Sequence, residues 1–233
     1  SIAKPSSNGS DKTYQELNDM QDMFEKRTPE IEKSVKDHDM EVGYAVKEYL
    51  KDNNLEYKES DIDKIADVGS GIVRHYKNKF ERPRPYQLAE AMDMKFNFMP
   101  LDSDSMKSPA YPSGHSLQSR LIAEYYVEKY PEHKKGLIEA ANMCGEGRVY
   151  AGWHYPSDHE ASVKLAKQIY PKINMRKTFK ESIIDIPRRT YAPKVFDDAD
   201  TKDPKIKASV KAQIDRQLKE FETEYPILKT SLI

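Results

Sequence analysis

The stretch YPSGHSLQSRLIAEYYVEKY, residues 111–130, decides how this chain is interpreted. Its second part has the apolar spacing of an amphipathic helix, and Pro112 and Ser113 mark a helix start, with Ser113 as N-cap. The first N–H groups of a helix have no intrahelical partner and carry the positive end of its dipole, so this start is suited to an anion. Gly114 lets an anion approach the backbone, and His115 stands beside it in the first turn. An ordinary capped helix with an incidental histidine explains the same residues.

Helical spacing of apolar residues recurs along the chain, whereas the alternation typical of strands is nearly absent. Ser60 and Asp63 resemble a capping box, and the prolines of ERPRPYQ, residues 81–87, are expected to stop the helix that follows this box. We therefore predict an all-α fold, a single-domain helical bundle. The segments with helical spacing are about 14–27, 29–39, 40–53, 62–80, 114–130, 134–153, 158–170 and 203–225.

Three parts of the chain differ in composition. Residues 1–12 are polar and rich in serine, so we expect a flexible N-terminal arm. Residues 13–172 are expected to form the helical domain. Residues 173–233 are expected to form a C-terminal extension with a terminal helix, which either packs on the domain or pairs with a second copy as a homodimer.

Composition excludes several classes of protein. The 233 residues hold 38 Lys and Arg against 39 Asp and Glu, so there is no overall basic field for nucleic acid. The mean hydropathy is −0.86, and no run approaches the roughly 18–20 apolar residues of a membrane span, which predicts a soluble protein. Cys144 is the single cysteine, which rules out an internal disulfide and a cysteine-based zinc site.

A second cluster lies in KNKFERPRP, residues 77–85. Lys77 stands near the end of a predicted helix, and Arg84 lies between two prolines that restrict its backbone. Arginine offers a fork of donors that matches phosphate oxygens, and lysine acts as a compact charge. A solvated basic patch is the alternative explanation.

A third cluster, GRVYAGWHYPSD, occupies residues 147–158. Arg148 lies on a predicted helix, His154 follows six residues later, and Ser157 is a candidate cap for the next helix. Asp158 would then lie near the imidazole of His154, where a carboxylate that accepts from Nδ1 leaves the Nε2 lone pair free. The alternative is a buried aromatic turn.

The three clusters together supply cations, a helix start suited to an anion, two histidines and an orienting carboxylate. The sequence shows no nucleophile elbow, no carboxylate cluster for Mg²⁺ and no glycine-rich phosphate loop. A tetrahedral oxyanion is the ligand that fits this set.

The order and spacing of these motifs resemble the type 2 phosphatidic acid phosphatase (PAP2) superfamily over about residues 60–172. The matching motifs are Lys77-x6-Arg84-Pro85, Pro-Ser-Gly-His at 112–115, and Arg148-x5-His154-x3-Asp158. The superfamily also holds the bacterial class A nonspecific acid phosphatases, which the chain resembles most, and the vanadium haloperoxidases. Two features depart from the pattern: Gly147 stands where the family usually has serine, and class A enzymes commonly carry disulfides.

The resemblance implies an acid phosphatase that hydrolyses a small phosphorylated substrate without a metal ion or other cofactor. His154 would be the nucleophile that forms a phosphohistidine, Asp158 would orient it, and His115 would be the general acid and base. The residues implied to hold the phosphoryl oxygens are Lys77, Arg84, Ser113, Gly114 and Arg148. An acidic pH optimum is expected, because His115 must be protonated while His154 is not.

Two other functions fit the same residues. A vanadium haloperoxidase would bind vanadate at His154 as a cofactor, whereas a phosphatase would be inhibited by vanadate. A non-catalytic protein that kept the fold would bind phosphate without turnover. The sequence does not fix a compartment, although the resemblance favours a periplasmic or secreted protein.

Overall fold

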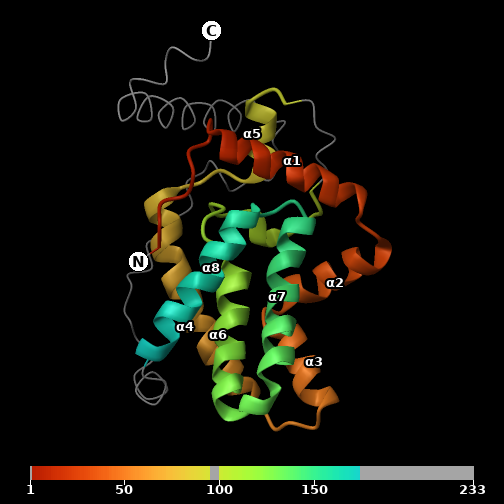
Figure 1. Cartoon of the computed structure of the whole chain (residues 1–233), viewed down its shortest axis with the longest axis vertical. Coiled ribbons are helices and arrows are strands. Elements are labelled where there is room, and N and C mark those ends of the chain that lie inside the picture. Colours follow the sequence, from red (N-terminus) through yellow and green to blue (C-terminus); the bar gives the residue numbers. More distant parts are fainter. Residues whose placement is uncertain (1, 95–99, 174–233) are drawn as a thin grey trace.

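The computed structural model describes residues 2–94 and 100–173, and within them every regular element is a helix (Figure 1), which confirms the all-α prediction. The α-helices are α1 Asp11–Glu25, α2 Pro29–Met40, α3 Tyr44–Asp52, α4 Glu59–Phe80, α5 Pro85–Ala91, α6 Gly114–Lys129, α7 Lys134–Tyr150 and α8 Pro156–Ile169. Short 3₁₀ helices cover Asp104–Met106, Pro131–His133 and Tyr170–Lys172.

Helix α6 is the centre of the bundle and packs against α7, α4 and α8. Its buried residues lie on several sides of the helix and include Leu117, Leu121 and Tyr126. They belong to a core that also takes in apolar residues of α3, α4, α7 and α8. A helix that is surrounded in this way is held rigidly, so the position of its first turn is fixed by the whole bundle.

Helix α7 runs antiparallel to both α6 and α8, so the start of α6, the end of α7 and the start of α8 meet at one end of the bundle (Figure 1). Helix α4 also ends there, and α1 crosses over the same end. A second apolar cluster joins α1 to this end through Leu17, Met20, Leu88 and Tyr155. All three motif-bearing segments therefore lie at one end of the fold.

Helix α4 ends at Phe80, so the prolines of residues 81–87 do stop this helix as expected, but three local features differ from expectation. Pro85 begins a further helix, α5, because proline is tolerated at the first helical position. Helix α4 begins at Glu59 with Lys58 at its N-cap, so Ser60 lies inside the helix and does not cap it. Likewise Ser157 lies inside α8, where Pro156 is the first residue.

The N-terminal residues contact the domain. Ser10 caps α1 by accepting a hydrogen bond from the amide of Thr13, so the helix starts at Asp11, earlier than expected. The Tyr111 hydroxyl donates to the carbonyl of Ala3 at 2.7 Å. Residues 174–233, and with them the predicted terminal helix, lie outside the described residues. Among the described helices, none has both the length and the apolar character that crossing a bilayer requires.

Candidate active site

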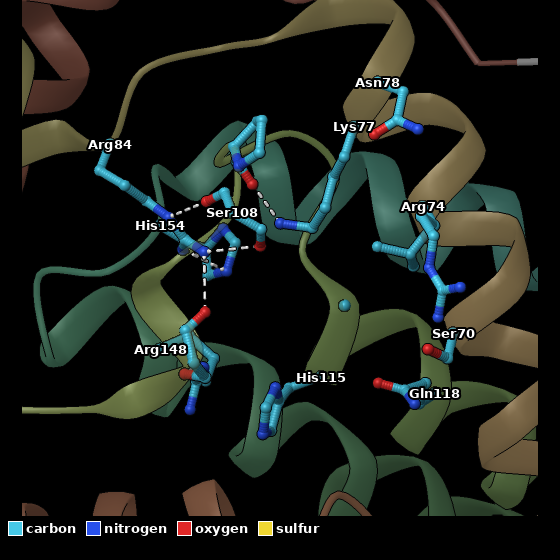
Figure 2. A pocket seen from close by; sticks show the side chains of 14 residues that line it. Ser70, Arg74, Lys77, Asn78, Arg84, Ser108, His115, Gln118, Arg148 and His154 are labelled. Carbon is cyan, nitrogen blue, oxygen red and sulfur yellow. Dashed lines mark hydrogen bonds between the residues drawn. The ribbon is translucent and has the colours of Figure 1, made fainter. Parts of the chain in front are cut away.

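A cavity of about 560 Å³ opens at the end of the bundle where the motif-bearing segments meet (Figure 2). Its walls come from α4, the 105–109 loop, the first turns of α6, and the end of α7 with the turn that follows it. The lining residues are Ser70, Val73, Arg74, Lys77, Asn78, Arg84, Ser105, Ser108, Pro109, Gly114, His115, Gln118, Arg148 and His154. The structure thus brings together the predicted residues Lys77, Arg84, Gly114, His115, Arg148 and His154.

The tautomer of His154 follows from its two ring contacts. Nη1 of Arg84 lies 2.9 Å from Nε2, and a guanidinium can only donate, so Nε2 must carry a lone pair. The ring proton is therefore on Nδ1, which lies 3.2 Å from Oδ2 of Asp158. Burial, reinforced by Arg84, lowers the pKa of His154 well below its usual value, so the imidazole is neutral. A neutral ring with its lone pair at Nε2 is a nucleophile.

Asp158 is fully buried behind His154 and is held by three donors. Oδ2 also accepts from the amide of Tyr155 at 2.9 Å, and Oδ1 accepts from Nη1 of Arg82 at 2.6 Å. Burial raises the pKa of Asp158 to about 6, and the charge of Arg82 acts in the opposite direction. The charge of Arg82 therefore offsets part of the effect of burial, so the carboxyl group is ionised above about pH 6.

Two residues of this network were missed by the sequence analysis. Arg82 is buried, and its Nη2 donates to Oε2 of Glu16 at 2.9 Å, while Oε1 of Glu16 accepts from the amide of Ser157. Helix α1 thereby fixes the start of α8, which carries Asp158. No local pattern marks Glu16, because its partners lie 66 and 141 residues away along the chain.

The cavity concentrates positive charge that has little compensation. The Lys77 ammonium donates to the carbonyl of Pro109, and Arg84 donates to the carbonyls of Ser108 at 2.8 Å and Trp153 at 2.7 Å. Within the described residues, neither cation has a carboxylate partner. Burial lowers the pKa of both side chains, to about 10 for Arg84 and well below the usual value for Lys77. An anion bound in the cavity would raise the pKa of both side chains.

Arg148 is the third cation, and it does have a carboxylate partner. It donates to Asp39 and to the hydroxyl of Ser105, and it stacks over Trp153 at 4.1 Å. Asp39 comes from α2 and also lies 3.8 Å, Oδ1 to Nε2, from His115. The sequence analysis missed Asp39, which lies 109 residues from Arg148 in the chain with no motif around it.

His115 is unprotonated at neutral and mildly acidic pH. Burial and the charge of Arg148 lower its pKa to about 3, although Asp39 acts to raise it. To act first as an acid, as the sequence analysis expects, His115 must therefore receive a proton from another source. A bound dianion would raise this pKa, because it adds negative charge beside the ring.

The start of α6 is built as expected. Ser113 caps the helix, since its hydroxyl accepts from the amide of Ser116 at 3.4 Å, and this confirms its predicted N-cap role. Its side chain is fully buried and is not among those that line the cavity, so its contact with a phosphoryl oxygen stays a prediction. Gly114 does line the cavity, where its missing side chain leaves the first amides of the helix accessible.

Comparison with known proteins agrees with this arrangement. Residues 65–167 match the family model of the PAP2 superfamily. The non-specific acid phosphatase of Providencia stuartii is 25% identical over 181 residues, which are 72% of this chain and 71% of that protein. The non-specific acid phosphatase of Salmonella typhimurium is 26% identical over 111 residues, 47% of this chain and 43% of that protein.

The part of the chain that holds the candidate site, residues 65–167, is therefore similar to the PAP2 superfamily. The matched segment contains every predicted site residue from Lys77 to Asp158, whereas Asp39 and Glu16 lie before it. Among solved structures, a transmembrane PAP2 type phosphatidylglycerolphosphate phosphatase from Bacillus subtilis aligns with 76% of this chain and 90% of its own, at 20% identity and a TM-score of 0.46.

Proposed function

We propose that this protein is an acid phosphatase that hydrolyses phosphomonoesters through a phosphohistidine on His154. Nε2 of His154 attacks phosphorus, and the bond to the leaving alkoxide breaks as the bond to nitrogen forms. Water then attacks the phosphohistidine, the bond to nitrogen breaks, and inorganic phosphate is released. The class of the domain and the names of its relatives support phosphatase activity.

The observation that carries the proposal is the pairing of a neutral, oriented imidazole with cations that lack counter-charge. Arg84 donates to Nε2 of His154, and attack requires this contact to be exchanged for contacts between Arg84 and phosphoryl oxygens. Phosphoryl transfer depends mainly on positioning and charge stabilisation, which Lys77, Arg84 and Arg148 would supply. In this proposal no metal ion is needed, because these cations balance the phosphoryl charge.

In this proposal His115 transfers the protons of both steps. It donates a proton to the leaving alkoxide in the first step and takes one from the attacking water in the second. Because burial and the charge of Arg148 lower the pKa of His115 to about 3, the proton arrives with the substrate: a monoester whose second pKa is about 6 is a monoanion at acidic pH. The acidic optimum then originates in the complex with the substrate and not in the free enzyme.

The proposal is tested with His154→Ala and p-nitrophenyl phosphate. We expect kcat to fall by about a thousandfold or more, because the covalent route is lost. His75→Ala is the matched control, since His75 is exposed on α4 and does not line the cavity. A folded His154→Ala enzyme that keeps the wild-type rate would refute the role of this nucleophile.

A further inference from the structure

One wall of the cavity lies beyond the groups that surround His154 and has no part in the mechanism above. It consists of Ser70, Arg74 and Asn78 on α4 together with Gln118 on α6 (Figure 2). In the figure these side chains lie on the side of the cavity opposite Arg84 and His154. A leaving group that extends away from the phosphoryl group would meet this wall.

Arg74 is the charged member of the wall. It precedes Lys77 by three residues and follows Ser70 by four, so the three side chains lie on the same face of α4. Arg74 is exposed at the mouth of the cavity, and within the described part of the chain it has no hydrogen bond or ion pair. Its guanidinium is therefore available to a ligand, about one helical turn from the ammonium that holds the phosphoryl group.

Gln118 adds an oriented acceptor. Its Nε2 donates to the carbonyl of Ala66 at 2.8 Å, which fixes the amide and directs Oε1 to the other side. A methyl group built on Gly114 would lie 3.7 Å from this oxygen, so Oε1 faces the space beside the first turn of α6. An acceptor at this place suits a hydroxyl group on the substrate.

The shape and chemistry of the cavity limit what the leaving group can be. Its volume of about 560 Å³ lies within the 300–1,000 Å³ typical of small-molecule sites and exceeds what a phosphoryl group fills. Val73 and Pro109 are the apolar side chains among the described lining residues, which include no Phe, Tyr or Trp. The wall therefore offers polar contacts and one unpaired positive charge, which do not suit an acyl chain or a stacked base.

We propose that the cavity selects phosphomonoesters whose leaving group carries a second anionic group, a carboxylate or a second phosphate, which binds Arg74. This inference rests on the proposed function, because the first phosphoryl group is placed at His154. Arg74 would act in binding and specificity, whereas the chemical step remains with the groups already described.

The test compares two aryl phosphates that differ in one group, phenyl phosphate and 4-carboxyphenyl phosphate. We expect wild-type kcat/KM to favour the carboxylated ester about tenfold, and Arg74→Gln to lower this ratio to about one or two, since a partly exposed ionic contact has modest strength. Lys79→Gln is the matched control: it removes one positive charge from the same helix at an exposed residue outside the cavity, and its ratio should equal that of wild type. A wild-type ratio of one or less, or a ratio that Arg74→Gln does not change, would overturn the proposal.

Binding of non-hydrolysable analogues separates this inference from the proposed function. Phenylphosphonate and 4-carboxyphenylphosphonate carry the same two charge patterns and cannot turn over. Their Kd values, measured by calorimetry, should differ about tenfold in wild type and by less than twofold in Arg74→Gln. If phenyl phosphate is not hydrolysed, the proposed function fails. The difference in Kd between the two phosphonates still shows whether Arg74 binds a second anionic group. Equal Kd values for the two phosphonates in wild type would contradict it.

A soluble bisphosphate and a lipid headgroup with a second phosphate present the same pair of charges. The two sources are distinguished with a glycerophosphate headgroup that carries a terminal phosphomonoester, supplied free and attached to short acyl chains. Similar kcat/KM values for both forms identify the polar headgroup as the recognised part, and a large gain with the chains identifies a lipid. In either case Arg74→Gln should lower kcat/KM several-fold, and an unchanged value for both forms would refute the role of Arg74.

Discussion

Replacing Asp158 with asparagine should inactivate the enzyme by reversing the tautomer of His154. The carboxylate accepts from Nδ1 of His154, from the amide of Tyr155 and from Arg82, so both of its oxygens face donors. An asparagine has one acceptor oxygen, and its amide nitrogen must then face a donor. If it faces His154, the ring proton moves to Nε2, the atom that we propose attacks phosphorus. If it faces Arg82, two donors face one another in a buried place.

The magnitude follows from this geometry. In a buried Asp–His pair of another enzyme the same exchange lowers kcat about 10⁴-fold, so we expect a loss of about 10³–10⁴, or roughly 4–5.5 kcal/mol of transition-state stabilisation. Stability should change less. The pKa of Asp158 in the folded protein, about 6, lies above its usual value, so ionisation of this carboxyl group destabilises the fold. The destabilisation is absent below about pH 4 and complete above about pH 6. At pH 7 asparagine removes this opposition of about 3 kcal/mol but leaves a donor unpaired, which costs about 1–3 kcal/mol.

The assay is hydrolysis of p-nitrophenyl phosphate at pH 5–7, with the melting temperature measured on the same samples. The two stability terms offset one another to within about 2 kcal/mol, so the melting temperature should stay within about 8 °C of wild type. Asp63→Asn is the control, because Asp63 is exposed on α4 and far from the motifs in sequence. A folded Asp158→Asn enzyme with more than a tenth of wild-type kcat would refute the argument that this carboxylate fixes the nucleophile's tautomer.

Three further predictions concern other parts of the site. Sulfate binding at pH 5.5 should take up protons, because a dianion raises the low pKa of His115. Calorimetry in buffers of different ionisation enthalpy should therefore give a binding enthalpy that changes with the ionisation enthalpy of the buffer; a binding enthalpy that is the same in all buffers would contradict this linkage. Arg148→Lys should lower kcat/KM about a hundredfold or more, since lysine keeps the charge but cannot contact Asp39 and Ser105 together, and a loss below threefold would be the contrary result. Gly145→Ala should lower the melting temperature by several degrees, because its Cβ would lie 2.2 Å from the His159 ring. Gly147→Ala should lower it much less, because its Cβ would lie 3.3 Å from a methyl group of Val35; equal melting temperatures would show that the contact with His159 relaxes freely.

Much of this fold could be predicted from sequence because its signals are local. Apolar spacing located the helices, and Ser113 was correctly identified as the N-cap of α6. The motif residues are close in sequence within each cluster, so their joint appearance indicated one anion site, and the cavity does collect Lys77, Arg84, His115, Arg148 and His154.

The residues that were missed act through contacts between distant segments. Asp39 and Glu16 belong to helices that precede the motifs, and a lone carboxylate on an amphipathic helix looks like any solvated side chain until the fold is known. Arg82 stood inside a motif but was interpreted as part of a basic patch, because only the packing of α1 and α8 shows its buried carboxylate partners. The helix starts at Pro85 and Pro156 were misjudged for a local reason, whereas the start at Pro29 was predicted correctly: the residue that breaks a helix interior is favourable at its first position.

The central claim is that Nε2 of His154 becomes covalently bound to phosphorus. The most direct measurement stops the reaction with base within milliseconds, digests the protein and locates the phosphoryl group by mass spectrometry. The account predicts a phosphoryl group on the peptide that contains His154, at the ring nitrogen, formed no later than the first released alcohol. A first turnover that releases alcohol while no peptide carries phosphorus, or one that labels a different residue, would contradict the account.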